Sequence, residues 1–423
     1  MIIYLKFIFL SFGLEKRLPD ELSKTIYYKI FNYEILSKPV NNKSKRYIML
    51  KTQQRYLALD VLRGVTIALM ILVNSPGSWD TIYAPFEHAA WHGFTITDLV
   101  FPTFLFVVGN AMSFSLRKFE GKDENLFLKK IFKRSLLIFL IGLFLSAFPF
   151  LYRDEAGELA FKNLANMRIM GVLQRIALCY LIASLLIHYL KLKVAVVVSI
   201  LILFGYWLVM YTFGDHPNPY SLTGNAALKF DLMLFRPENL WKGFGMAFDP
   251  EGLLSTFPAV VNVVAGYLAG IFIQKSGNTF STVWKLVLAG IIGVILAQIW
   301  DLIFPINKGI WTSSYVLLST GWDLIIIALL IWVIELRKIK RWTYFFEVFG
   351  KNPLFIFVLS GLVVMLMSII LINSESLKLW IYNNGFLSWL TDLNASLAFA
   401  VCYVLLMWVV GYIMDKRKIY IKV

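Results

Sequence analysis

The chain has 423 residues, of which 59% are hydrophobic, and its mean hydropathy is +0.69. Soluble domains carry about 45–50% apolar residues, so this composition excludes an ordinary soluble protein. The formal net charge of +15 would suit a nucleic-acid-binding protein, but the positions of the basic residues argue against that class, as described below.

The first 54 residues differ from the rest of the chain. They hold a short apolar run, from Ile2 to Leu14, and then a polar stretch rich in Lys and Asn. A helix needs about 20 apolar residues to span a bilayer, and this run is shorter. It also lacks the small-residue cleavage site of a signal peptide. We therefore predict that residues 1–54 are an N-terminal extension and that Met49 is the true start. A genuine interfacial arm is the alternative.

Ten apolar runs make up most of the remaining chain. Runs of about 20 residues separated by short charged loops are typical of transmembrane helices, and the alternating segments of a β-barrel do not occur. We predict an all-α, polytopic membrane domain over residues 55–414 and a basic cytoplasmic tail over residues 415–423. The predicted spans are 57–74, 96–116, 131–150, 169–189, 194–213, 253–274, 286–304, 313–335, 347–372 and 394–414.

The distribution of lysine and arginine predicts the orientation. Cytoplasmic loops of membrane proteins are enriched in these residues. With the N-terminus inside, the inside segments from residue 43 onward hold 24 Lys and Arg, whereas the outside segments hold 8. Both termini are therefore predicted to be cytoplasmic. The basic charge is explained by topology, so no nucleic-acid partner is expected.

The first span carries three polar residues that a simple anchor does not need. A charge within a span costs about 2.5–3.5 kcal/mol on insertion scales, so such residues are functional candidates. Asp60 and Arg63 are three residues apart and can form an ion pair; alternatively, Arg63 binds an anion such as a phosphate. Asn74 ends the span, where its amide either caps the helix or holds an oxyanion.

The following outer loop contains two histidines, His88 and His92. Their spacing resembles half a zinc site, but no third ligand is evident and no metal is predicted. Histidine titrates near neutral pH and suits general acid–base catalysis of a reaction at an amine or hydroxyl. His88 is followed by Trp91 and by a span that opens with Asp98. This context favours a catalytic loop over the alternative, an ordinary polar interface.

Two later regions also carry candidate residues. Gln174 and Arg175 lie inside the apolar run GVLQRIALCY, with no acidic residue within one helical turn. Arg175 either pairs with a carboxylate from another helix or binds an anion in a central cavity. The long outer segment 214–252 ends with Asp249 and Glu251. A long outer loop of this kind predicts a lid or the rim of a substrate site.

Five segments, in this order, resemble the bacterial relatives of heparan-α-glucosaminide N-acetyltransferase, a lysosomal membrane enzyme. They are LDVLRGVTIALMILVN, HAAWHGFTITDLVFPTFLFVVG, GVLQRIALCY, DPEGLLSTFPAVVNVVAGYLAG and PINKGIWTSSYVLLSTG. The likeness covers roughly residues 55–414. It implies that His88 is the catalytic histidine, that Asn74 is its partner, and that acetyl-coenzyme A is the acyl donor, loaded from the cytoplasm.

We therefore predict an N-acetyltransferase of the bacterial inner membrane, surrounded by lipid. It would move an acetyl group from acetyl-coenzyme A to an amino group of an aminosugar or glycan on the periplasmic side. His88 would act as general base or as acetyl carrier, and Asn74 would stabilise the oxyanion. The predicted donor-binding residues are Arg63, Gln174 and Arg175, and the predicted acceptor-binding residues are Trp91, His92, Asp98, Asp249 and Glu251.

A transporter or flippase of a sugar or lipid-linked substrate is the rival function. The Phe101-Pro102 pair, predicted to break the second span, supports it. The sequence has no convincing internal repeat, which counts against it. The oligomeric state stays open between a monomer and a homodimer.

Overall fold

The computed structural model describes residues 56–119, 123–154 and 158–421. The predicted extension over residues 1–54 and the predicted true start at Met49 lie outside these described residues. Most described residues are helical, which confirms the all-α class. Strands within the described ranges form two short antiparallel hairpins.

The helices match the predicted spans in order, with boundaries that differ by a few residues. The main helices are α4 (Leu57–Asn74), α5 (Ile96–Ser115), α6 (Glu124–Ala147), α7 (Val172–Tyr189), α8 (Leu192–Phe213), α10 (Thr256–Ser276), α11 (Phe280–Asp301), α12 (Ser313–Leu330), α13 (Thr343–Lys351), α14 (Pro353–Ile369) and α16 (Asp392–Lys416). The π-helical turn η6 (Ile331–Leu336) extends α12. The short elements are α9 (Ala226–Leu234), α15 (Leu377–Tyr382), β1 (Leu151–Arg153), β2 (Leu159–Phe161), β3 (Leu371–Ile372) and β4 (Glu375–Ser376).

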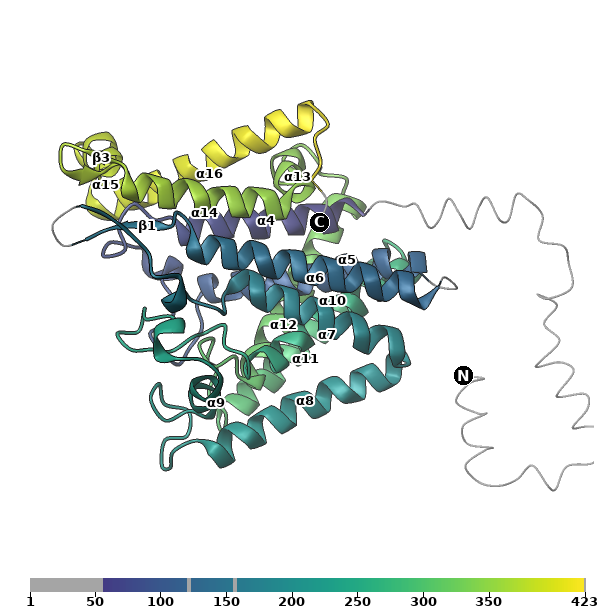
Figure 1. Cartoon of the computed structure of the whole chain (residues 1–423). Helices are drawn as coiled ribbons and strands as arrows, with labels where there is room; N and C mark the ends of the chain where they lie inside the picture. The colour runs from purple at the N-terminus through teal and green to yellow at the C-terminus, as the bar shows by residue number, and fades with distance from the viewer. Residues whose placement is uncertain (1–55, 120–122, 155–157, 422–423) are drawn as a thin grey trace, which may run out of the picture. The chain divides into compact units, whose positions relative to one another are not determined.

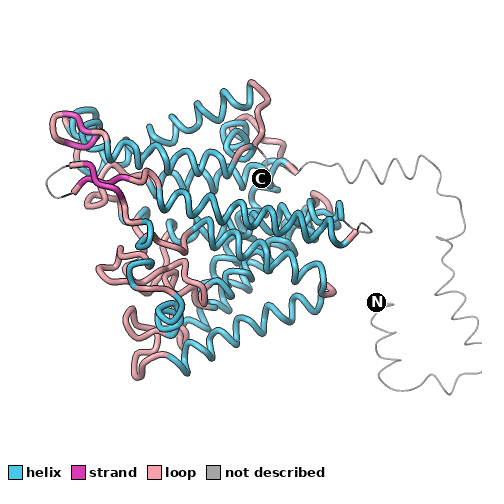
Figure 2. Tube along the Cα trace, viewed as in Figure 1, coloured by secondary structure: helices cyan, strands magenta, loops and turns pink. Residues whose placement is uncertain are grey.

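The helices form a bundle with two distinct ends (Figure 1). One end carries the hairpins and α9, and we name it the loop end; Figure 2 shows the loops and strands that gather there. The other end carries α13, and we name it the tail end. Helix α4 runs from the tail end to the loop end and packs against α5, α13, α14 and α16. Helix α5 packs closely on α10 at Gly109. A Cβ atom at this position would clash with the carbonyl oxygen of Val263, so only glycine permits the contact.

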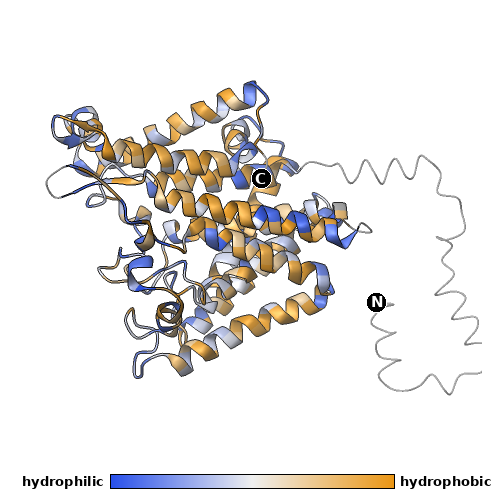
Figure 3. Ribbon diagram, in the orientation of Figure 1, coloured by the Kyte–Doolittle hydropathy of each residue, from blue (hydrophilic) through white to orange (hydrophobic). Residues whose placement is uncertain are grey.

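The surface of the bundle is apolar along the helices. Figure 3 shows hydrophobic residues along the helix lengths and hydrophilic residues concentrated near the ends. Helices α8 and α11 expose large aliphatic and aromatic side chains, among them Leu201, Phe204, Leu208, Ile292, Ile295 and Ile299. An exposed apolar surface of this extent fits contact with lipid.

Eight of the described helices are long and apolar enough to cross a membrane, or nine if α13 and α14 form one span. The remaining predicted span corresponds to α6. This helix begins seven residues before the predicted boundary of 131 and includes its charged first turns. The chain is thus a multi-pass membrane protein, with α6 accounting for the difference from ten predicted spans.

The predicted continuous span over residues 347–372 is wrong in one respect, because α13 and α14 meet at an angle of 84°. Pro353 begins α14 and Asn352 has non-helical backbone angles, so the first helix cannot continue into the second. The Asn352 amide donates to the carbonyl oxygen of Ile419 at 3.0 Å and accepts from the N–H of Ile421 at 2.8 Å. The described C-terminal residues therefore fasten the bend.

The predicted break at Phe101-Pro102 is also wrong, because α5 is continuous through Pro102. Proline lacks the N–H that would bond the carbonyl oxygen four residues earlier, which here belongs to Asp98. The Tyr315 hydroxyl of α12 donates to this oxygen at 2.6 Å. Because a neighbouring helix supplies the missing donor, α5 continues without interruption.

Candidate active site

A cavity of about 510 Å³ lies at the loop end, where α4 ends and α5 begins. Its wall is built from the end of α4, the loop 75–95, the starts of α5 and α7, and the segments 237–255 and 302–312. Five predicted site residues line it: Asn74, His88, Trp91, Asp98 and Glu251. Arg168 and Lys308 line it as well. A space of this size accommodates a small organic substrate.

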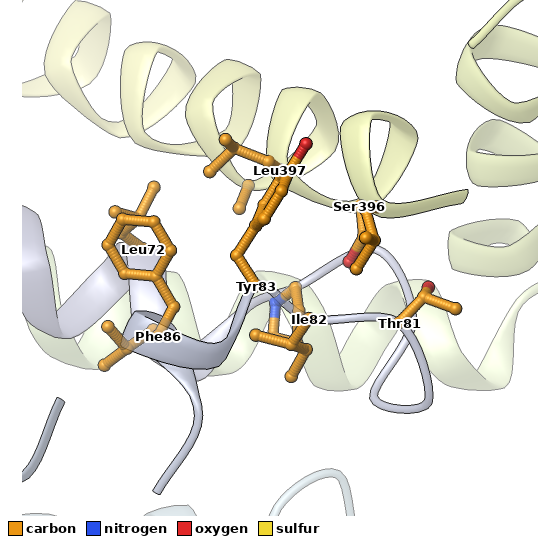
Figure 4. Close-up of a pocket in the computed structure, with 11 residues that line it drawn as sticks. Leu72, Thr81, Ile82, Tyr83, Phe86, Ser396 and Leu397 are labelled. Carbon is orange, nitrogen blue, oxygen red and sulfur yellow. The ribbon is translucent and has the colours of Figure 1, made fainter. Parts of the chain in front are cut away.

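The loop that carries His88 is held at its start by α16. The backbone N–H of Gly77 donates to the carbonyl oxygen of Ser396 at 3.3 Å, and the Tyr83 hydroxyl donates to the Asn394 side chain at 2.6 Å. Figure 4 shows Tyr83 and its neighbours against Ser396 and Leu397, around a pocket of only about 20 Å³. Close packing here leaves little freedom for the loop.

The same loop is held at its end by segment 302–312. Gly93 adopts a φ of +120°, a backbone conformation that favours glycine. Its N–H donates to the carbonyl oxygen of Ile306 at 2.8 Å. The loop then enters α5 through a capping box between Thr95 and Asp98. His88 therefore lies on a segment fixed at both ends.

His88 and Asp98 form a hydrogen-bonded pair at the cavity wall. The Nδ1 atom of His88 lies 2.7 Å from Oδ1 of Asp98. The other carboxylate oxygen accepts the backbone N–H groups of Ala89 and Thr95, each at 3.1 Å. The Asp98 side chain is 1% exposed, whereas the His88 side chain is 45% exposed. Asp98 therefore holds the imidazole in place at the wall of the cavity.

This arrangement determines what the imidazole can do. A carboxylate only accepts hydrogen bonds, so Nδ1 must carry the proton in the contact with Asp98. The Nε2 atom then carries the ring's lone pair, and Lys308 Nζ lies 3.5 Å from it. A neutral imidazole of this tautomer, supported by a carboxylate, is suited to take a proton from a substrate.

Lys308 lies against both members of the pair. Its Nζ atom is 3.1 Å from Nδ1 and 3.5 Å from Nε2 of His88, and 3.5 Å from Oδ1 of Asp98. Burial lowers the pKa of Lys308, although the charges of Asp98 and Glu251 act in the opposite direction. The cavity thus holds a partly desolvated ammonium beside the imidazole.

Across the cavity, Arg168 binds two carboxylates. Its Nε and Nη2 atoms donate to the two oxygens of Asp249 at 2.8 and 2.6 Å, and Nη2 also donates to Glu251. Burial alone would lower the pKa of Arg168, but the carboxylates raise it above its usual value. Burial would raise the pKa of Glu251, but Arg168, Arg175 and Lys308 lower it. Asp249 does not line the cavity, so only Glu251 of this predicted pair lies on its wall.

Aromatic side chains complete the wall. Trp91 donates from Nε1 to the carbonyl oxygen of Tyr220 at 2.9 Å and packs edge-on against Phe244 at 5.6 Å between ring centroids. Trp79 and Trp241 also line the cavity. Large aromatic faces with a few polar groups form a surface that suits a ligand with both apolar and polar parts.

His92 does not line the cavity with His88. Residues 87–95 are not helical, so the four-residue spacing does not place the two imidazoles on one helical face. His92 Nδ1 lies 3.3 Å from the Asn307 amide, and burial lowers the pKa of His92. The structure thus places His92 as a neutral contact between its loop and segment 302–312.

The three residues predicted to bind the donor also lie outside the cavity wall. Arg63 lies 3.5 Å from Asp60, in the ion pair that its spacing allows, and it precedes Asn74 by about 16 Å of helix. Arg175 is fully buried and donates to the Gly252 carbonyl oxygen and to Ser255. Among the described hydrogen bonds of Arg175, none reaches a carboxylate on another helix.

Gln174 lies against Gly142 of α6, and its Nε2 atom has no hydrogen-bond partner in the described part of the chain. Gln174 therefore lies at the contact between α7 and α6 in the structure. The three candidates therefore occupy three different environments, with Arg63 toward the tail end and the other two near the loop end.

Two cavity residues, Arg168 and Lys308, were not predicted. In the sequence, both count only as basic charges of the outside segments. Lys308 lies within PINKGIWTSSYVLLSTG, one of the five segments that carry the family resemblance. This was the one signal in the sequence that pointed to it. Arg168 precedes the start of α7 by four residues, and no local pattern distinguishes it from an ordinary loop arginine.

Known proteins resemble this chain over most of its transmembrane region. Residues 55–292 match the family model described as heparan-alpha-glucosaminide N-acetyltransferase, catalytic. The chain is 28% identical to heparan-alpha-glucosaminide N-acetyltransferase of Homo sapiens over 361 residues, which cover 72% of this chain and 52% of the human protein. It is 26% identical to the Mus musculus protein of the same name over 358 residues, or 72% and 53% of the two chains. The chain thus spans about half the length of these curated relatives.

Proposed function

Because the chain belongs to the heparan-alpha-glucosaminide N-acetyltransferase catalytic family, we propose that it is a membrane N-acetyltransferase acting on an amino group of an aminosugar. The observation that carries this proposal is the 2.7 Å contact between His88 and buried Asp98 at the wall of the cavity. A supported imidazole is the group that an amine acceptor needs, since the amine must lose a proton when it is acylated.

In the proposed reaction, the acceptor nitrogen attacks the acetyl carbonyl carbon of the thioester. A C–N bond forms, the carbonyl oxygen becomes an oxyanion, and His88 Nε2 takes the proton from nitrogen. The C–S bond then breaks, and the thiolate receives the proton from His88. Asn74 lies exposed on the cavity wall, where its amide can donate to the oxyanion.

Acetyl-coenzyme A is the proposed donor, loaded from the cytoplasm. The excess of basic residues predicts that the tail end faces the cytoplasm and that the loop end, with the cavity, faces the periplasm of a bacterial inner membrane. Arg63 lies on the tail-end half of α4, so it suits the phosphate-bearing part of the donor better than Arg175 or Gln174. Coenzyme A is a long molecule. Its phosphate-bearing end would lie near Arg63, and its thioester end would lie at the cavity.

The acceptor is proposed to bind between Glu251 and the aromatic wall. A carboxylate accepts a hydrogen bond from the N–H of a neutral amine, and aromatic faces pack against the apolar faces of sugar rings. Glu251 and Trp91 serve these roles directly. Asp249 and His92 act through Arg168 and Asn307, respectively.

The test is acetyl transfer from radiolabelled acetyl-coenzyme A to glucosamine in proteoliposomes. We expect transfer by the wild type and at least a hundredfold loss in His88→Ala. His216→Ala is the matched control, since His216 is an exposed outer-loop histidine and its loss should leave the rate within about threefold.

Three other outcomes have distinct meanings. Equal transfer by wild type and His88→Ala would remove His88 as the base. Acetyl-His88 trapped by rapid acid quench would replace direct transfer with an acetyl-histidine relay. Absence of transfer to every amine acceptor tried would refute the proposed activity.

A further inference from the structure

Lys308 lies beside the proposed base but has no role in the reaction described above. It comes from segment 302–312, about 220 residues away in sequence from the loop of His88, yet its Nζ atom lies within 3.5 Å of both ring nitrogens. Its side chain is 20% exposed and lines the cavity. A lysine held in this way faces any group that binds at Nε2.

The ammonium retains a donor for a substrate. Nδ1 of His88 donates to Asp98, so it cannot also accept a hydrogen bond from Lys308. Among the described contacts of Nζ, the remaining acceptors are Oδ1 of Asp98 and Nε2 of His88, each at a long 3.5 Å. An ammonium carries three N–H donors, so at least one remains for an atom in the cavity.

The charges around Lys308 keep the ammonium in place. Asp98 on α5 and Glu251 on segment 237–255 are the negative groups that act on it. His88 is the neighbouring titratable group. Arg168 also lines the cavity and is itself bound to Glu251. Two carboxylates therefore attract the ammonium, while desolvation at the cavity wall strengthens its field.

We infer that Lys308 is a catalytic residue whose ammonium stabilises the oxyanion formed on the acyl carbonyl while His88 accepts the amine proton. This inference rests on the proposed acyl transfer. The carbonyl oxygen of the tetrahedral intermediate is two bonds from the nitrogen that faces Nε2, and Lys308 Nζ lies 3.5 Å from Nε2. A cation at this position opposes negative charge that develops only during the reaction, so it should act on kcat.

The first experiment compares Lys308→Met and Lys308→Arg in the acetyl-transfer assay. We expect Lys308→Met to lower kcat by about 10²–10³-fold with the donor KM within about threefold, as for loss of one oxyanion donor. Lys308→Arg keeps the charge and should retain more activity than Lys308→Met. Lys242→Met is the matched control, because Lys242 is an exposed lysine beside the cavity residues Trp241 and Gly243.

The second experiment restores the ammonium chemically. Lys308→Cys is made with Cys402→Ala, which removes the exposed native thiol; the other cysteine, Cys179, is buried. Alkylation with 2-bromoethylamine rebuilds a lysine-like ammonium, and alkylation with 2-bromoethanol builds a neutral side chain of similar length. We expect the first reagent to recover at least tenfold in kcat and the second to recover none.

A kcat of Lys308→Met within threefold of wild type would overturn the inference while leaving the acetyltransferase intact. Equal recovery by both reagents would assign Lys308 a packing role and would also overturn it. If the wild type transfers acetyl to no acceptor, the proposed function fails and this inference fails with it. Thermal melting and gel filtration of each variant separate these results from misfolding.

Discussion

Replacing Asp98 by Asn tests the geometry of the site more sharply than removing His88. The substitution keeps the size of the side chain but replaces one oxygen by an NH₂ group. The backbone N–H groups of Ala89 and Thr95 both point at one oxygen, at 3.1 Å, and need an acceptor. The single oxygen of the substituted side chain must therefore stay there, which turns the new NH₂ toward His88.

This orientation reverses the imidazole tautomer. Nδ1 would have to accept from the NH₂ group, so the proton would move to Nε2 and the lone pair that takes the amine proton would be lost. General-base catalysis contributes about 10²–10⁴-fold, so we expect kcat to fall by that factor, or about 2.7–5.4 kcal/mol in activation free energy. The loss of a charged acceptor should also lower the stability by about 1–3 kcal/mol.

The assay is the initial rate of acetyl transfer at saturating donor, with a thermal melt of each variant. Asp80→Asn is the control, because Asp80 lies exposed in the same loop and should keep the wild-type rate. A kcat for Asp98→Asn within tenfold of wild type, in a folded protein, would refute the tautomer argument.

Three further predictions concern contacts around this pair. Burial lowers the pKa of Lys308, so its ammonium is lost as pH rises through that lowered value. The pH–rate profile should therefore decline on the alkaline side. The Lys308→Arg variant should move this decline to higher pH. Tyr315→Phe removes the donor to the Asp98 carbonyl oxygen and should lower stability by about 1–3 kcal/mol in a thermal melt; an unchanged melting temperature would contradict this. His92→Gln should leave kcat within about threefold, because His92 is bound to Asn307 outside the cavity wall; a hundredfold loss would place it in the reaction.

The sequence predicted those parts of the fold and site that depend on nearby residues. Apolar runs identified the main helices apart from the division between α13 and α14, because helix length in a membrane follows from bilayer thickness. Asn74, His88 and Asp98 lie within 25 residues of one another, so the end of one helix and the start of the next bring them together. Their common position on the cavity was therefore accessible from local pattern, although their roles remain proposals.

Other features depend on contacts between distant segments, which local patterns do not show. Lys308 reaches His88 across about 220 residues of sequence. The continuity of α5 through Pro102 requires a hydroxyl from α12. The bend at Asn352 is fastened by residues near the described C-terminus. Each of these depends on which helices become neighbours, and hydrophobic periodicity does not specify that pairing.

The loop of His88 is fastened at its start to α16, through Ser396, and at its end to segment 302–312, through Ile306. It therefore joins α16 to segment 302–312. Any movement that separated α16 from the start of α12 would stretch this loop and shift the imidazole relative to Lys308. The position of the imidazole therefore depends on both attachments of the loop.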